Sequence, residues 1–134
     1  DCLAVCPWNK YAKAASEAAL WPRIELTAPR LGEFAGLDDA SFRQVFTGSP
    51  IKRTGRDRFV RNVLIAIGNG ADPTLAPVAE RLLDDASPLV RAMAVWALAR
   101  LLDAAPFESL RARHLPREID PAVAAEWSDA DAAA

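Results

Sequence analysis

The chain has 134 residues and a mass of 14.5 kDa, a length that suits one domain built around a single core. Apolar residues make up 51% and charged residues 25%, an ordinary globular composition that disfavours wholesale disorder and a membrane-spanning class. No window approaches the roughly 20 consecutive apolar residues that cross a bilayer, and the N-terminus lacks the pattern of a signal peptide. We therefore expect a cytoplasmic protein with no membrane partner.

The formal net charge of −2 hides an uneven distribution of charge. The ten residues from Lys52 to Arg61 hold five basic side chains and one acidic side chain, a local charge of +4, whereas the other 11 basic and 17 acidic residues sum to −6. The chain is rich in alanine and has only six glycines, which favours helix over strand. The sequence thus predicts a mildly acidic helical body that carries one basic patch.

Both cysteines lie at the start of the chain, as Cys2 and Cys6 in the pattern Cys-x₃-Cys-Pro. This spacing is the end of the bacterial ferredoxin pattern that ligates [4Fe–4S] clusters, and a reducing cytosol argues against a disulfide. A cluster takes four thiolates, so we expect this chain alone to hold none. The chain begins with Asp1 rather than methionine, and we expect the missing ligands upstream of it. The alternative is an unremarkable pair of intracellular thiols.

Helical periodicity and capping signals predict a series of short helices. An aspartate after Leu37 can cap a helix whose apolar face holds Phe42, Val45 and Phe46, and Gly48 with the proline that follows ends it. The predicted helical segments are residues 8–20, 31–35, 37–46, 60–67, 73–83, 88–102 and 106–113. Residues after 114 are expected to be irregular.

Part of the sequence repeats itself. The strings that begin Val60-Arg61 and Val90-Arg91 align without a gap at a separation of 30 residues, a period typical of helical solenoids. The second string resembles a HEAT-like repeat, and we expect Asp85 to pair with an arginine between stacked repeats. The residues that carry this resemblance are Asp85, Pro88, Val90, Arg91, Ala94, Ala97 and Leu98.

The predicted fold class is all-α, with short helices stacked as a HEAT-like right-handed helical repeat and no sheet. Ser87-Pro88 is read as the cap and first turn of a helix in this stack. The predicted organisation is a truncated [4Fe–4S] motif at 1–10, connector and capping helices at 11–50, HEAT-like repeats at 51–113 and an irregular tail at 114–134.

The basic patch is the strongest candidate for a binding site. Each cation at a helix N-terminus is unfavourable by about 0.3–1 kcal/mol. This placement is explained if an anion binds there, because guanidinium groups and free backbone N–H groups would hold it. A solvated face or ion pairs with the acidic body is the alternative. The candidate phosphate ligands are Lys52, Arg53, Arg56, Arg58 and Arg61.

Hydrolytic or acid–base chemistry finds little support in the sequence. His114 is the only histidine, so the serines and cysteines lack an obvious base. No Gly-rich phosphate loop or zinc-binding pattern is present. We therefore expect no catalytic residue in this chain.

Three strings in this order resemble the C-terminal part of the epoxyqueuosine reductase family, over roughly residues 1–102. They are Cys2-Leu-Ala-Val-Cys6-Pro-Trp-Asn-Lys, then Phe46-Thr-Gly-Ser-Pro-Ile-Lys-Arg-Thr-Gly-Arg, then Arg58-Phe-Val-Arg-Asn-Val-Leu-Ile-Ala-Ile-Gly-Asn with the HEAT-like repeat after it.

The resemblance implies a cobalamin-dependent oxidoreductase with two [4Fe–4S] clusters, which reduces epoxyqueuosine to queuosine at the wobble position of certain tRNAs. It implies that Cys2 and Cys6 are the last two thiolates of the second cysteine motif and that Cys6 ligates the other cluster. The basic patch would contact the tRNA anticodon arm. The cobalamin and ferredoxin-like domain lies upstream in this family, so the chain alone is expected to be inactive.

Two other interpretations stay open on the sequence. One is a HEAT-like protein-interaction module whose basic loop meets an acidic partner. The other is the end of another cobalamin- and cluster-dependent reductase, such as a relative of the dehalogenases.

Overall fold

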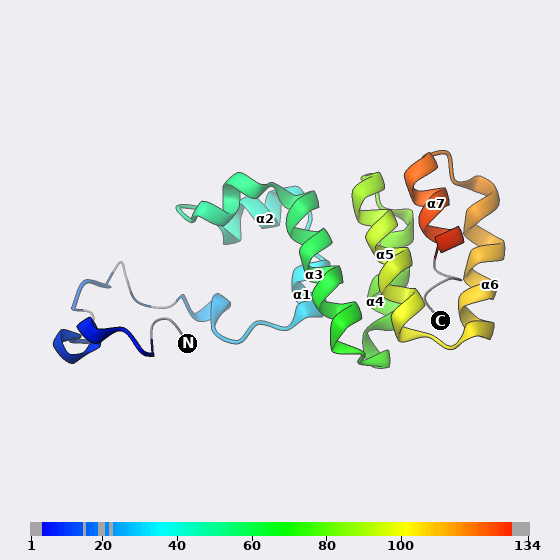
Figure 1. Ribbon diagram of the computed structural model, residues 1–134. Coiled ribbons are helices and arrows are strands. Elements are labelled where there is room, and N and C mark those ends of the chain that lie inside the picture. The colour runs from blue at the N-terminus through cyan, green and yellow to red at the C-terminus, as the bar shows by residue number, and fades with distance from the viewer. Residues whose placement is uncertain (1–3, 15, 19–20, 22, 130–134) are drawn as a thin grey trace.

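The computed structural model describes residues 4–14, 16–18, 21 and 23–129, and every regular element among them is a helix (Figure 1). The α-helices are α1 (Leu31–Ala35), α2 (Asp39–Val45), α3 (Arg56–Gly70), α4 (Ala76–Arg81), α5 (Pro88–Leu101), α6 (Ala104–His114) and α7 (Pro121–Asp129). The 3₁₀ helices are η1 (Pro7–Tyr11), η3 (Ile24–Leu26), η4 (Pro50–Thr54), η5 (Pro73–Leu75), η6 (Leu82–Asp84) and η7 (Leu115–Arg117). The predicted all-α class without a sheet is confirmed for the described part of the chain. None of the described helices has the length and apolar character needed to span a bilayer.

From α3 to α7 successive helices of the chain run in alternating directions, so that α3, α5 and α7 point the same way (Figure 1). The core lies between them, and its main contacts join α5 to α3 on one side and to α7 on the other. Burial follows the sequence repeat, since Val60 and Val90 are both fully buried and so are Leu64 and its counterpart Ala94. The separation of 30 residues therefore brings equivalent apolar positions of α3 and α5 into one core.

A second apolar cluster holds α1 and α2 on the start of α3. Asp38 caps α2 by accepting a hydrogen bond from the Ser41 N–H at 2.7 Å. Phe42 and Phe46 are then buried. Their rings pack on each other and on that of Phe59, and the ring of Phe34 packs on those of Phe46 and Phe59, with centroid distances of 4.8–5.9 Å. The aromatic face predicted for this helix is thus confirmed, and it fixes the position of the turn that follows α2.

The predicted helix over residues 8–20 is wrong. Among the described residues of this stretch, η1 ends at Tyr11, and residues 12–14, 16 and 17 are not helical. Trp8 and Tyr11 are 73% and 62% exposed, so this segment buries no apolar face against the rest of the described chain. Without such burial, a short helix of weak amphipathic character is not stable in water.

The prediction that residues after 114 are irregular is wrong for 115–129, where η7 and α7 form. Val123 and Trp127 are each 1% exposed and belong to the core, and α7 packs on α5. Packing of these two side chains stabilises a stretch whose composition alone favours a loose tail. Residues 130–134 lie outside the described residues.

The predicted cap of α5 is also corrected. The Ser87 side chain makes no capping hydrogen bond, and instead the Ser87 N–H donates to Asp85 Oδ1 at 2.9 Å. The carboxylate two residues earlier therefore replaces the serine in organising the start of this helix.

Candidate nucleic-acid interface

The segment that follows α2 exposes two cations. Gly48 has φ +73°, a left-handed conformation that favours glycine, and the Ser49 side chain caps η4 by accepting from the Ile51 N–H at 3.2 Å. Lys52 and Arg53 follow in η4 and are both exposed. A shallow hollow of about 350 Å³ is lined by Gly48, Ser49, Pro50, Lys52 and Arg53, none of which is acidic. We call residues 48–53 the basic turn.

Arg23 reaches the basic turn from the N-terminal connector. Its Nη1 donates to the Val45 carbonyl at 3.0 Å and its Nη2 to the Thr47 carbonyl at 2.6 Å. Nη2 would lie 3.5 Å from a Cβ built on Gly48. A third cation therefore stands beside the turn and balances the negative end of the α2 dipole. Arg23 is absent from the predicted ligands, because no local spacing connects it to a turn more than twenty residues later.

Arg56, the third predicted phosphate ligand, is bound inside the fold. Its Nη1 and Nη2 contact Asp85 Oδ1 and Oδ2 at 2.9 and 2.6 Å, and its Nε donates to the Leu37 carbonyl at 3.0 Å. The two side chains are only 16% and 8% exposed. The expectation that Asp85 pairs with an arginine is confirmed.

The pKa values of this pair reflect the contact. The hydrogen bond to Asp85 raises the pKa of Arg56. Burial alone raises the pKa of Asp85, but the hydrogen bonds from Arg56 and from the Ser87 N–H outweigh burial and leave that pKa below its ordinary value. Both groups therefore stay charged and paired at neutral pH.

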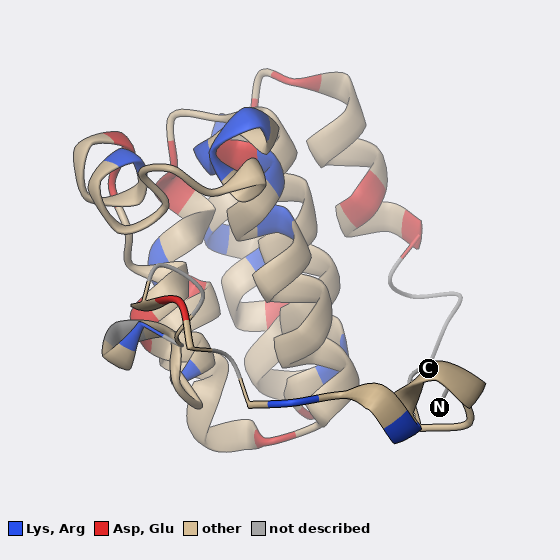
Figure 2. Cartoon of the chain, turned by 90° about the vertical axis from the view of Figure 1, so that its left-hand side faces the viewer, with Lys and Arg blue, Asp and Glu red and all other residues tan. Residues whose placement is uncertain are grey.

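Arg58 and Arg61 differ from each other. Arg58 lies exposed in the first turn of α3, and within the described part of the chain its side chain has no hydrogen bond or ion pair. Arg61 is half-buried, with its guanidinium on Asn62 Oδ1 at 2.9 and 3.2 Å. In Figure 2, Lys and Arg gather in the upper middle of the face that the view presents. The structure thus leaves Lys52, Arg53 and Arg58 available to an anion.

The predicted cluster ligands are described only in part. Cys6 is a half-buried free thiol, and Cys2 lies outside the described residues. Within the described residues no group of three potential metal ligands comes together. The whole sequence has two cysteines, so the chain can contribute at most half of the four thiolates that a [4Fe–4S] cluster takes.

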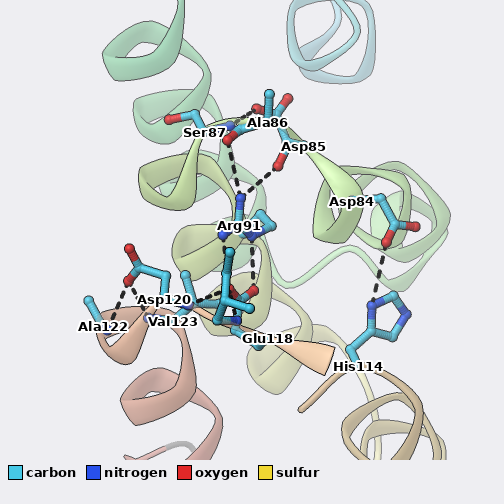
Figure 3. Close-up of polar contacts among 11 residues, drawn as sticks. Asp84, Asp85, Ala86, Ser87, Arg91, His114, Glu118, Asp120, Ala122 and Val123 are labelled. Carbon is cyan, nitrogen blue, oxygen red and sulfur yellow. Dashed lines mark hydrogen bonds and ion pairs between the residues drawn. The ribbon is translucent and has the colours of Figure 1, made fainter. Parts of the chain in front are cut away.

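A separate hollow of about 310 Å³ lies between the start of α5 and η7 and includes His114. Its charged groups are paired: Arg91 binds Glu118, and Asp84 Oδ1 lies 3.8 Å from His114 Nδ1 (Figure 3). Arg117 Nη2 also contacts Asp84 Oδ1 at 3.0 Å and His114 Nδ1 at 2.9 Å. Burial, and then the charge of Arg117, lower the pKa of His114. These contacts tie neighbouring helices together and leave no obvious nucleophile and base pair in this hollow.

Known proteins resemble this chain over most of its length. The chain is 39% identical over 102 residues to epoxyqueuosine reductase of Xanthomonas campestris, an alignment that covers 75% of the chain and 28% of the relative. It is 35% identical over 104 residues to epoxyqueuosine reductase of Escherichia coli, covering 77% of the chain and 27% of the relative. The chain is homologous to a part of epoxyqueuosine reductase. It spans little more than a quarter of the length of these relatives.

Solved structures of epoxyqueuosine reductase share the fold. One, solved with an epoxyqueuosine-modified tRNA-Tyr stem loop, superposes with a TM-score of 0.84 at 24% identity, covering 96% of this chain and 34% of that one. The Bacillus subtilis epoxyqueuosine reductase superposes with the same TM-score and identity, over 96% and 35% of the two chains. No family model matches the sequence. The likeness in fold thus covers a larger share of the chain than the sequence alignments do.

Proposed function

We propose that this chain is the tRNA-binding portion of an epoxyqueuosine reductase and that it holds the anticodon arm through backbone phosphates. The observation that carries the proposal is the basic turn, where Lys52 and Arg53 stand exposed beside a hollow without an acidic side chain. Arg58 extends this surface onto the first turn of α3, where the helix dipole adds to the positive field. The solved relative with a tRNA stem loop supports RNA as the ligand.

In this proposal the whole enzyme reduces epoxyqueuosine to queuosine at the wobble position, in the cytoplasm. Two [4Fe–4S] clusters and cobalamin would supply the electron transfer and the reduction. This chain would give Cys2 and Cys6 as cluster ligands, and an upstream domain would provide the cobalamin site and the other thiolates. Residues 51–113 would form the HEAT-like repeats that bind and orient the RNA, and the chain alone would be inactive.

The experiment measures binding of an anticodon stem-loop RNA by fluorescence anisotropy at several salt concentrations. The double variant K52A/R53A should bind more weakly, and the slope of log K against log salt should become less steep by one to two, about 0.7–0.9 for each phosphate that the variant no longer neutralises. Arg100→Ala is the control for loss of one exposed charge outside the basic turn, because Arg100 lies near the far end of α5. If K52A/R53A and the parent chain have equal affinity and equal slope, the proposal is wrong.

A further inference from the structure

Arg56 lies between the exposed cations of the basic turn and Arg58, yet its side chain faces the interior. One guanidinium joins three segments of the chain: the Leu37 carbonyl between α1 and α2, Asp57 at the start of α3 at 3.3 Å, and Asp85 before α5. The contact to Asp85 uses both terminal nitrogens and both carboxylate oxygens, the fork geometry in which arginine binds most firmly. A phosphate would have to displace a largely buried carboxylate to reach the same fork.

The junction between η4 and α3 is a single glycine. Gly55 connects the two elements with φ +80°, and a Cβ built there would meet no atom within 4 Å. Glycine adopts positive and negative φ about equally readily, so its own backbone does not fix the direction in which the chain leaves η4. Arg56, which follows it, therefore helps to hold the angle at which the basic turn meets the helix.

Asp85 is itself held in place by neighbouring groups. Its Oδ1 accepts the Ser87 N–H at 2.9 Å, and its backbone carbonyl accepts Arg91 Nη1 at 2.9 Å (Figure 3). Arg91 in turn binds Glu118 before α7. The orientation of Arg56 is thus set by contacts that continue from α3 across α5 to α7.

We propose that Arg56 is a positioning residue rather than a phosphate ligand: its contact with Asp85 holds the basic turn and Arg58 at the separation that the RNA backbone requires. This inference rests on the proposed function. It removes Arg56 from the predicted set of phosphate contacts and gives it a different role at the same site.

Asp85→Asn distinguishes the two roles because they predict opposite signs. Asparagine keeps an oxygen for the Ser87 N–H but loses the ion pair. If Arg56 positions the turn, D85N binds the anticodon stem-loop RNA about three- to tenfold more weakly with an unchanged salt slope. If Arg56 is a ligand, D85N binds more tightly, since it frees a guanidinium and removes a negative charge. Asp84→Asn is the matched control, because it makes the same charge change at the adjacent residue, whose partner is Arg117.

Arg56→Gln gives a second measurement, with helix content checked by circular dichroism for every variant. The positioning role predicts weaker binding and an unchanged salt slope, whereas a ligand role predicts a slope less steep by about one. Tighter binding by D85N, or a reduced slope for R56Q in a folded chain, would overturn the inference. If K52A/R53A weakens binding while D85N does not, the inference alone fails; if K52A/R53A has no effect, the proposed function fails.

Discussion

The Arg91 guanidinium donates two parallel hydrogen bonds to the Glu118 carboxylate, from Nε to Oε2 and from Nη2 to Oε1, each at 2.9 Å. The same guanidinium donates to the backbone carbonyls of Asp85 and Ala86 at 2.9 and 3.2 Å. Glu118 also accepts the N–H groups of Ile119 and Asp120. One ion pair thus joins the loop before α5 to the loop before α7, in the way that Arg56 and Asp85 join α3 to α5.

The Arg91–Glu118 pair makes stability depend on pH. The hydrogen bond from Arg91 lowers the pKa of Glu118 below its ordinary value of 4.5. The stabilisation is therefore complete above pH 4.5 and is lost as the pH falls through the lowered pKa of the folded state. Glu118→Gln should reduce the free energy of unfolding by about 2 kcal/mol at pH 7 and flatten its decline below pH 4.5, measured by urea titration.

Glu108→Gln is the control for that prediction. Glu108 pairs with Arg111 one turn along α6 and is 54% exposed, so its loss should cost less than about 0.5 kcal/mol. An unfolding free energy with the same acid dependence in E118Q and the parent chain would show that the pair does not contribute as described.

Gly68 allows α3 and α5 to approach closely. A Cβ built on Gly68 would lie 2.6 Å from Trp96 Cζ3 and 3.2 Å from Ala97 Cα. Gly68→Ala should therefore destabilise the fold by about 1–3 kcal/mol through overpacking, although alanine favours helix. Gly70→Ala, which meets nothing within 4 Å, should be neutral or stabilising. Chemical denaturation of both variants tests this, and equal stabilities would contradict the close approach.

Ala71 ends α3 in a conformation that suits glycine. Its φ is +49° and its ψ is 32°, a left-handed geometry that costs a residue with a Cβ about 1 kcal/mol. Ala71→Gly should raise the free energy of unfolding by up to about 1 kcal/mol. The control is Ala66→Gly at an exposed position inside the same helix, where glycine should cost about 1 kcal/mol. Destabilisation by both substitutions, measured by chemical denaturation, would argue against strain at Ala71.

Much of the helical layout could be predicted from the sequence, because its signals are local. Asp38 caps α2, Gly48 turns the chain after it and Pro88 begins α5, since each acts through its own backbone or that of near neighbours. The spacing of 30 residues likewise identified equivalent buried positions. The basic patch was visible for the same reason, as charge gathered within ten residues.

The roles of individual residues in that patch were decided by the tertiary structure. Arg56 and Arg58 are two residues apart and look equivalent in the sequence, yet one meets Asp85 and the other is exposed. Arg23 reaches the basic turn from the N-terminal connector. Burial of Trp127 stabilises a helix in a segment that the sequence predicted to be irregular. The sequence by itself determined where helices begin and where charge collects, because hydrogen bonding and composition act over a few residues. Only the packing of distant segments decided which charges are neutralised and which short helices are stable, because burial and ion pairing depend on partners that chain folding brings together.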